Sequence, residues 1–184
     1  MTEFACTPGQ TVGPFLGLGL PYRGDSELVA GGHPRAVRLH GTVYDGAGEP
    51  VPDALVELWQ PDGAGHIPRT AGPLCRDGTA FTGWGRSATD AAGRYGFTTV
   101  APGSGDPGRP PFFALAVFAR GLLDRLFTRA YLPYGDPGAD PLLAAVEAGR
   151  RASLTCVAES GRAEYRFDIR LQGPNETVFL EYRG

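Results

Sequence analysis

Residues 37–60 read VRLHGTVYDGAGEPVPDALVELWQ and contain two runs typical of β-strands, separated by a stretch rich in glycine and proline. In the first run, residues 37, 39, 41 and 43 are apolar or glycine, whereas the residues between them are polar or aromatic. This period of two is typical of a strand with one face in a core. The second run, ALVELWQ over residues 54–60, follows the turn residues directly. The pattern therefore predicts two strands joined as a hairpin.

Further strand-like runs follow, each bounded by turn residues. A turn sequence at residues 89–93 precedes RYGFTTV, and the apolar run FFALAVF at 112–118 is followed by RLFTRAYL at 125–132. The clearest strand is AEYRFDIRL at 163–171, where apolar and charged residues alternate, and TVFLEY at 177–182 closes the series. One short peripheral helix is expected after Asp140, an N-cap residue followed by Pro141. The sequence predicts an all-β fold, an antiparallel β-sandwich of seven or eight short strands.

The chain divides by composition into an arm and a domain. Residues 1–36 contain glycine, proline and threonine with scattered apolar residues and no sustained period, which predicts an irregular N-terminal arm. Its segment TPGQTVGPF, residues 7–15, carries backbone groups that need partners and apolar side chains that need cover. We expect this arm to pack on another surface, and residues 37–184 to form the sandwich domain.

Composition and charge exclude several classes of protein. All 17 basic residues are arginine, the net charge is −3 and no basic run is present, which argues against nucleic acid as a partner. No stretch approaches the roughly 20 apolar residues of a membrane span. The start, MTEFACTPGQ, lacks the basic and apolar regions of a signal peptide. We therefore expect a cytoplasmic protein with no membrane contact.

The residues taken alone contain no catalytic or metal-binding motif. The three histidines, His33, His40 and His66, form no H-x-H or H-E-x-x-H pattern. Three widely spaced cysteines, at positions 6, 75 and 156, indicate neither a disulfide framework nor a zinc site. His40 is expected to take a hydrogen-bonded role on the polar side of its strand.

Arg120 is the one charge in the apolar run FFALAVFAR, residues 112–120. A strand that is apolar on both faces is typical of the centre of a sheet, and a charge there is costly unless it is paired or opens onto a site. Two interpretations stay open at this point. Arg120 forms an ion pair with an Asp or Glu at the end of the sandwich, or it contacts an anion in a pocket.

Several motifs in fixed order resemble the intradiol ring-cleavage dioxygenases over nearly the whole chain. They are the arm motif T-P-x-Q-T-x-G-P (7–14), LHGTVYDGAGEPVPDALVELWQ (39–60), GWGRSATDAAGRYGF (83–97), VFARG (117–121) and YRFDIRLQGPNETVF (165–179). The resemblance implies the β-sandwich of that family. The alternative is a transthyretin-like β-sandwich that serves as a binding or carrier module, but it leaves the arm, VFARG and YRFDIRLQG unexplained.

The resemblance also implies where iron is held. In that family a catalytic, beta-type chain binds Fe(III) with two tyrosines and two histidines, the histidines forming an H-x-H at the start of the strand that here reads PPFFALAVF. The matching positions are Phe112 and Ala114, and the tyrosines would fall near Ser104 or Gly105 and near Pro73. Phenylalanine and alanine have no donor atoms for iron. The resemblance thus implies an alpha-type chain without catalytic residues or metal of its own, with the iron held by a beta-type partner subunit.

A substrate pocket shared with that partner is the last implication of the resemblance. The reaction would be cleavage of protocatechuate by O2 to 3-carboxy-cis,cis-muconate, and this chain alone would be inactive. In the family, the pocket is lined by the arm, which packs on the partner, and by the arginine after the apolar strand. The matching residues are Thr11, Gly13, Pro14, Phe15 and Arg120. A guanidinium suits the substrate carboxylate, and Phe15 stands where such chains often have a tyrosine.

Overall fold

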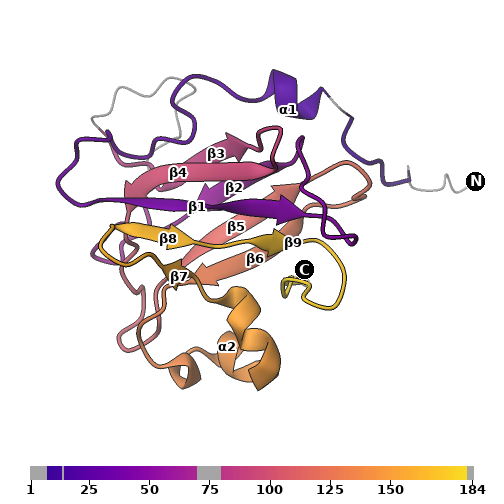
Figure 1. Cartoon of the computed structure of the whole chain (residues 1–184). Helices are drawn as coiled ribbons and strands as arrows, with labels where there is room; N and C mark the ends of the chain where they lie inside the picture. Colours follow the sequence, from indigo (N-terminus) through magenta and orange to yellow (C-terminus); the bar gives the residue numbers. More distant parts are fainter. Residues whose placement is uncertain (1–7, 14, 70–79, 182–184) are drawn as a thin grey trace, which may run out of the picture.

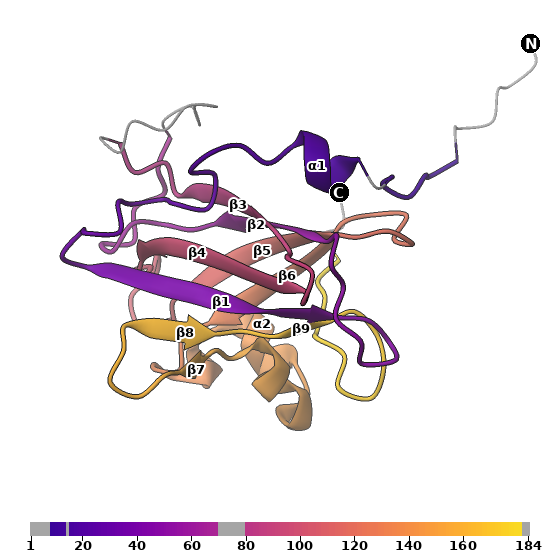
Figure 2. The same cartoon turned by 45° about the horizontal axis from the view of Figure 1, so that its top comes forward.

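The computed structural model describes residues 8–13, 15–69 and 80–181 (Figure 1). Its strands form two layers, which Figure 2 shows from a second direction. One sheet has the order β4-β1-β8-β7, with β9 also paired to β1, and the other has the order β3-β2-β5-β6. The bounds are β1 Ala36–Tyr44, β2 Leu55–Trp59, β3 Trp84–Ala88, β4 Arg94–Val100, β5 Phe112–Phe118, β6 Leu126–Tyr131, β7 Val157–Ala158, β8 Glu164–Arg166 and β9 Ile169–Arg170. The predicted all-β sandwich is confirmed, although the described residues form nine strands in place of the expected seven or eight, two of them only two residues long.

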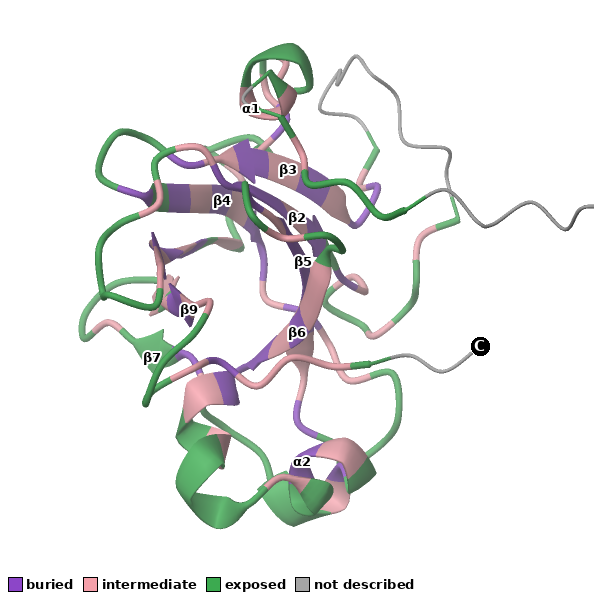
Figure 3. Ribbon diagram, turned by 90° about the vertical axis from the view of Figure 1, so that its right-hand side faces the viewer, coloured by how far each residue is buried: buried purple, intermediate pink, exposed green. Residues whose placement is uncertain are grey.

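Apolar side chains of both sheets meet in one core between the layers. Alternation in β1 buries Leu39 and Val43, and Val56 and Leu58 of β2 are buried from the other sheet. The same core takes in side chains from later strands, among them Phe97, Phe113, Leu115, Phe167 and Ile169. Figure 3 shows the result, with buried residues on the strands and exposed residues mainly in the connections and in α2.

The hairpin predicted for residues 37–60 is wrong, because β1 and β2 lie in different sheets. The chain turns back on β1 only briefly: Tyr44 and Pro50 form a single antiparallel bridge, and the amide of Val51 donates to the carbonyl of Val43 at 2.9 Å. It then crosses to the second sheet, where β2 pairs with β3 and β5. The strand beside β1 is instead β4, with Leu39 opposite Phe97. Alternation identifies the buried face of a strand but does not identify the strand that pairs with it. β1 and β2 both bury an apolar face in the shared core, so the same pattern fits two strands in different sheets.

The run AEYRFDIRL forms two short strands and not one. β8 and β9 both pair with β1 in parallel, with Leu39 opposite Tyr165 and Val43 opposite Ile169. Between these pairs, the carbonyl oxygen of Phe167 lies so close to Gly41 that a Cβ atom there would be 1.9 Å away. The Tyr95 hydroxyl donates to the same carbonyl at 2.5 Å. The sheet is therefore mixed, and the expected purely antiparallel pairing does not hold for β8 and β9.

The C-terminal run TVFLEY is not a strand over residues 177–181. Its sheet pairing is a single bridge between Leu180 and Phe127 of β6. The amide of Thr177 bonds back to the carbonyl of Arg170 at 3.0 Å, and Thr128 of β6 donates to the carbonyl of Val178 at 2.9 Å. These scattered contacts leave no regular ladder, so the expected closing strand is wrong.

The predicted short helix begins as expected after Asp140. It is α2, Pro141–Ala145, and the Asp140 carboxylate accepts hydrogen bonds from the amides of Leu142 and Leu143. Two 3₁₀ segments flank it, η1 at Pro137–Ala139 and η2 at Ala148–Leu154. Arg151 donates to the carbonyl of Val146, which satisfies a carbonyl beyond the helix end. None of the helices among the described residues has the length and apolar character to cross a bilayer.

The arm contributes one short helix, α1 (Leu16–Gly19), and then joins the sandwich. Leu28 is buried in the core, and its amide donates to the carbonyl of Thr98 in β4 at 2.8 Å. The amide of Arg86 in β3 donates to the carbonyl of Asp25 at 2.8 Å. The arm thus crosses the edges of both sheets before β1 begins (Figure 1).

Candidate functional site

Arg120 and Asp53 form an ion pair at one end of the second sheet. Arg120 follows the buried Ala119 after β5, and Asp53 precedes the buried Ala54 before β2. The Nε atom of Arg120 contacts Oδ2 of Asp53. The arginine side chain is 57% exposed and that of Asp53 is 25% exposed. The ion pair foreseen for Arg120 therefore exists, and more than half of its side chain stays open to solvent.

The arm lies beside this ion pair. The hydroxyl of Thr11 accepts a hydrogen bond of 2.7 Å from the amide of Gly121, the residue after Arg120. On the other side, Gly17 in α1 faces the carbonyl of Asp53, which would be 3.7 Å from a Cβ atom at that position. Three segments that are distant in the sequence therefore meet here, namely the arm, the β1–β2 connection and the β5–β6 connection.

The five residues predicted to line a substrate pocket have different surroundings. Thr11 and Arg120 are brought together through Gly121. Gly13 is exposed, and a Cβ atom there would meet nothing within 4 Å. Phe15 precedes α1 with 78% of its surface exposed. Pro14 lies outside the described residues, so the pocket as a whole stays a prediction.

Large apolar side chains around the arm lack cover in the isolated chain. Phe15 and Leu18 are 78% and 77% exposed, and Leu123 in the β5–β6 connection is 64% exposed. Leu123 lies next to the arm, since its Cβ atom is 3.7 Å from the position of a Cβ atom at Gly9. We call Phe15, Leu18 and Leu123 the exposed apolar side chains of the arm region.

A cavity of about 270 Å³ lies at the other end of β5, where the resemblance puts the iron ligands of the catalytic chain. Ser104, Gly105 and Phe112, which stand for ligand positions, all line it. The guanidinium of Arg129 from β6 lies over the Phe112 ring, 4.1 Å from its centre. The same guanidinium is 3.4 Å from the Asp140 carboxylate. The cavity is therefore bordered by a stacked cation.

The donor set around this cavity does not fit a ferric ion held by two tyrosines and two histidines. Phe112 offers a hydrocarbon ring, and the described lining contains no histidine, tyrosine or cysteine. The carboxylate of Asp140 caps α2, and that of Asp106 pairs with Arg109 at 2.9 Å. The nearby Tyr131 hydroxyl accepts a hydrogen bond from Arg129, and burial raises the pKa of Tyr131, so this phenol stays protonated at neutral pH. The position near Pro73 lies outside the described residues.

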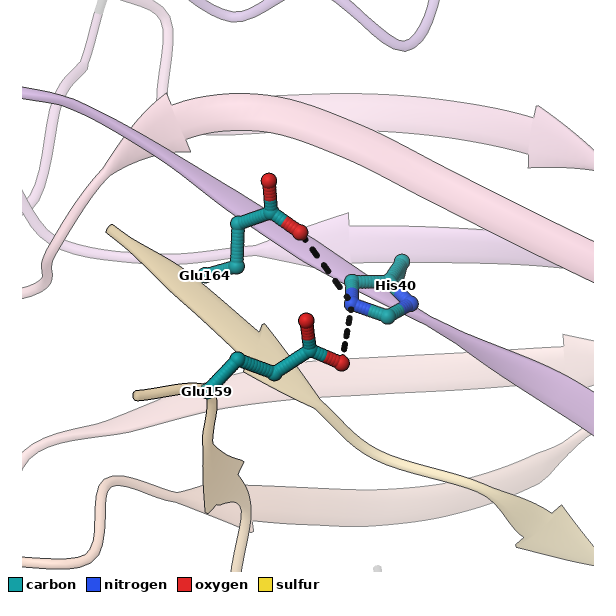
Figure 4. Close-up of side chains that lie close together, drawn as sticks. All are labelled: His40, Glu159 and Glu164. Atoms are coloured by element: carbon teal, nitrogen blue, oxygen red, sulfur yellow. Dashed lines mark ion pairs between the residues drawn. The ribbon is translucent and has the colours of Figure 1, made fainter. Parts of the chain in front are cut away.

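His40 belongs to a cluster with two carboxylates on the first sheet (Figure 4). Its Nε2 atom is 3.3 Å from Oε1 of Glu159 and 3.7 Å from Oε2 of Glu164. In the described part of the chain, this is the one group of three His, Cys, Asp or Glu side chains whose ligand atoms lie within 4.8 Å of one another. The cluster joins the β7–β8 connection to β1, but His40 Nε2 makes no hydrogen bond to either carboxylate, so the hydrogen-bonded role expected of His40 is not confirmed at this atom. Sequence reasoning missed both partners, which the parallel register of Arg38 with Glu164 brings close.

Cys156 is the cysteine that the described residues include, and it is a buried free thiol. Burial raises its pKa to about 12, so the thiolate needed for a nucleophile is scarce near neutral pH. The free thiol of Cys156 agrees with the expectation that the cysteines form no disulfide framework. Cys6 and Cys75 lie outside the described residues.

Comparisons with known proteins identify the family. A family profile described as "Dioxygenase" matches residues 23–173. The protocatechuate 3,4-dioxygenase alpha chain of Burkholderia cepacia is 40% identical, covering 98% of this chain and 100% of that relative. The corresponding alpha chain of Pseudomonas putida is 36% identical over 96% of both chains. The protocatechuate 3,4-dioxygenase beta chain of B. cepacia is 36% identical, covering 81% of this chain and 70% of the relative.

Solved structures share the fold. The dioxygenase domain of a carbohydrate-binding fusion protein from Streptomyces sp. SirexAA-E superposes with a TM-score of 0.61 at 24% identity, covering 91% of this chain and 99% of that one. Catechol 1,2-dioxygenase from Acinetobacter sp. ADP1 gives a TM-score of 0.59 at 22% identity, covering 86% and 60%.

The sandwich and these matches define the class: the chain belongs to the dioxygenase family. The resemblance to intradiol ring-cleavage dioxygenases is thereby confirmed. Within the family, the chain is similar from end to end to the alpha chains of protocatechuate 3,4-dioxygenase.

Proposed function

We propose that this chain is the alpha subunit of a protocatechuate 3,4-dioxygenase and that it completes a substrate pocket whose reactive centre lies on a beta subunit. One observation carries the proposal. In a chain 40% identical to an alpha chain, the positions matched to the iron-binding histidines are Phe112 and Ala114, and Arg129 stacks on Phe112. A hydrocarbon ring under a guanidinium neither donates to a metal nor leaves the site attractive to a cation.

The partner in this proposal is a beta subunit. The exposed apolar side chains of the arm region support it, because surfaces of this kind on a folded chain commonly mark contacts with another protein. The relative from B. cepacia that is called a beta chain shows that both kinds of chain belong to this one family. We extend to this chain the pairing that the names of the relatives describe.

Iron belongs to the beta subunit in this proposal. The family is iron-dependent in general, and the described residues at the matching positions here lack the required donors. The cleavage chemistry is therefore assigned to the partner. The contribution of this chain is to bind and orient the substrate and to exclude water from the pocket.

The residues that would contact protocatechuate are Thr11, Gly13, Pro14, Phe15 and Arg120. Arg120 is suited to the substrate carboxylate because more than half of its side chain is exposed and it follows directly on the end of β5. Hydrogen bonds to charged groups contribute about 1.5–3 kcal/mol each. Arg120 would then hold the carboxylate at one end of the substrate, and the two catechol hydroxyls at the opposite end would face the reactive centre of the partner subunit.

Expression of the chain with and without its partner tests the proposal. The purified chain alone should contain no stoichiometric iron and should not consume O2 with protocatechuate. Co-expression with its proposed beta partner should restore both iron and turnover. Turnover by the isolated chain, or an adjacent reading frame without a homologue that has the two-tyrosine, two-histidine set, would argue against the assignment.

A further inference from the structure

We propose that Asp53 is a positioning residue that orients Arg120 toward the carboxylate of the substrate. This inference rests on the proposed function, in which Arg120 contacts that carboxylate. Among the residues that the structure describes, Asp53 is the one ion-pair partner of Arg120. Nothing in the sequence near Arg120 points to Asp53, which lies in a different connection.

The register of the second sheet sets the two residues opposite each other. β2 and β5 pair antiparallel with Leu55 opposite Phe118. Continuing that register by two residues sets Asp53 opposite Arg120, on the sheet face that carries Leu55 and Phe118. The pair is therefore a cross-strand pair just beyond the end of the ladder. The relative position of the two side chains is therefore set by the pairing of β2 with β5, whose side chains pack in the core.

The contact engages one side of the guanidinium. Asp53 meets Nε, which is the donor nearest the arginine stem, and the arginine side chain as a whole is still 57% exposed. A guanidinium presents five N–H donors in a rigid plane, so fixing one edge also fixes the direction of the others. An arginine without this contact samples many rotamers and loses that freedom when it binds an anion. Asp53 thus prepares the side chain for binding in advance.

Charge alone would give Asp53 the opposite effect. A carboxylate beside Arg120 competes with an incoming anion, and removing it would strengthen binding if net charge decided the outcome. Both side chains are partly exposed, where solvent screens Coulomb attraction strongly. The loss of orientation should therefore outweigh the gain in net charge. The two accounts predict opposite signs for the same substitution.

The arm adds a second reason for placing Asp53 in the binding machinery. Gly17 of α1 faces the carbonyl of Asp53, and Thr11 holds the amide that follows Arg120. The ion pair therefore joins the two connections that Thr11 and Gly17 of the arm contact. A change in the Asp53 side chain acts on the guanidinium directly, and the carbonyl that meets the arm is unchanged.

Steady-state kinetics of the co-expressed alpha–beta complex test the proposal with four variants of this chain. They are Asp53→Asn, Asp53→Glu, Arg120→Ala and the double variant with Asp53→Asn and Arg120→Ala. We expect Asp53→Asn to raise KM for protocatechuate about 2- to 10-fold, as loss of one preorganised side chain predicts. The value of kcat should change less than twofold. KM for catechol, which lacks the carboxylate, should stay unchanged, and Asp53→Glu should restore most of the affinity for protocatechuate.

The double variant separates this inference from the proposed function. If Asp53 acts through Arg120, Asp53→Asn has no further effect once Arg120 is alanine. An unchanged KM in Arg120→Ala contradicts the pocket role of Arg120 and thus the proposed function. If Arg120→Ala raises KM but Asp53→Asn leaves KM unchanged or lowers it, the role of Asp53 is overturned and the proposed function is not. The same conclusion follows if the effects of the two substitutions on KM add up in the double variant. Melting temperature and iron content of each complex are measured alongside, and if Asp53→Asn fails to assemble, Asp53→Ser, which also removes the carboxylate, replaces it in the single and double variants under the same expectations.

Discussion

The hydroxyl of Thr11 accepts a hydrogen bond from the amide of Gly121, and this bond joins the N-terminal arm to the residue that follows Arg120. Both residues are exposed, so in the isolated chain the bond competes with water. It ties the arm to the end of β5, where substrate binding is proposed. The arm and the guanidinium should therefore respond together when the bond is lost.

Thr11→Val removes this acceptor while keeping the shape of the side chain. We expect faster hydrogen exchange at the Gly121 amide in the isolated chain, because its partner would then be water alone. In the alpha–beta complex, KM for protocatechuate should rise several-fold. Thr11→Ser keeps the hydroxyl and serves as the matched control. Equal exchange at Gly121 in the Val and Ser variants would show that the arm is held by other contacts.

Gly41→Ala should destabilise the chain strongly. The added methyl group would lie 1.9 Å from the carbonyl oxygen of Phe167, which also accepts a hydrogen bond from the Tyr95 hydroxyl. Relief requires moving the segment between β8 and β9 away from β1, at a cost of about 2–4 kcal/mol in the free energy of unfolding. Urea unfolding measures this change. Gly149→Ala is the control, because a Cβ atom there meets nothing within 4 Å. A loss below about 1 kcal/mol would contradict the close approach of Phe167 to β1.

Cys156 should make the chain less stable at alkaline pH. Burial raises the pKa of its thiol from 9.0 to about 12, so between these values the folded state keeps a proton that the unfolded state has lost. The stabilising contribution is complete below pH 9 and decreases as pH rises through that window, by at most about 1.4 kcal/mol per pH unit. Unfolding curves from pH 8 to 11 measure the slope. In a background with Cys6→Ser and Cys75→Ser, Cys156→Ala should flatten it, although Tyr134, whose pKa is also raised to about 12, keeps a slope of the same sign. If the free energy of unfolding changes with pH equally with and without the Cys156 thiol, the burial of this thiol is contradicted.

Phe112→His combined with Ala114→His should not create an iron site. The double substitution restores the H-x-H pattern, but the guanidinium of Arg129 lies 4.1 Å from the centre of the ring at position 112. The positions matched to the tyrosine ligands also stay without phenols. Metal analysis after incubation of the isolated chain with iron should give far less than one equivalent. One tightly held iron per chain would show that the pocket keeps its metal-binding shape.

Strand content follows from the sequence more directly than strand pairing. The alternation in residues 37–44 correctly placed Leu39 and Val43 in the core, and the alternation in residues 163–171 did the same for Phe167 and Ile169. Pairing depends on contacts between distant segments. The hairpin expected at residues 37–60 failed because the connection crosses between sheets, and AEYRFDIRL breaks where Phe167 meets Gly41.

Sequence reasoning predicted some residues of the candidate site but not others. A charge at the end of an apolar strand singled out Arg120, and the resemblance singled out Thr11. Asp53 has no local signal, because its role appears only when β2 and β5 are paired in register. The same holds for His40, whose partners Glu159 and Glu164 come from the far end of the chain.

The double pairing of β1 has a consequence for how the chain folds during synthesis. One edge of β1 is covered by β4, but the other is paired only with β8 and β9, which are translated long after β1 and β4. Until then a ribosome-bound chain presents an open strand edge, which is a template for association with other chains. Because these pairings join segments that are far apart in the sequence, folding should be slow. A chaperone that shields the edge of β1 would raise the yield of assembled enzyme more than a faster rate of translation.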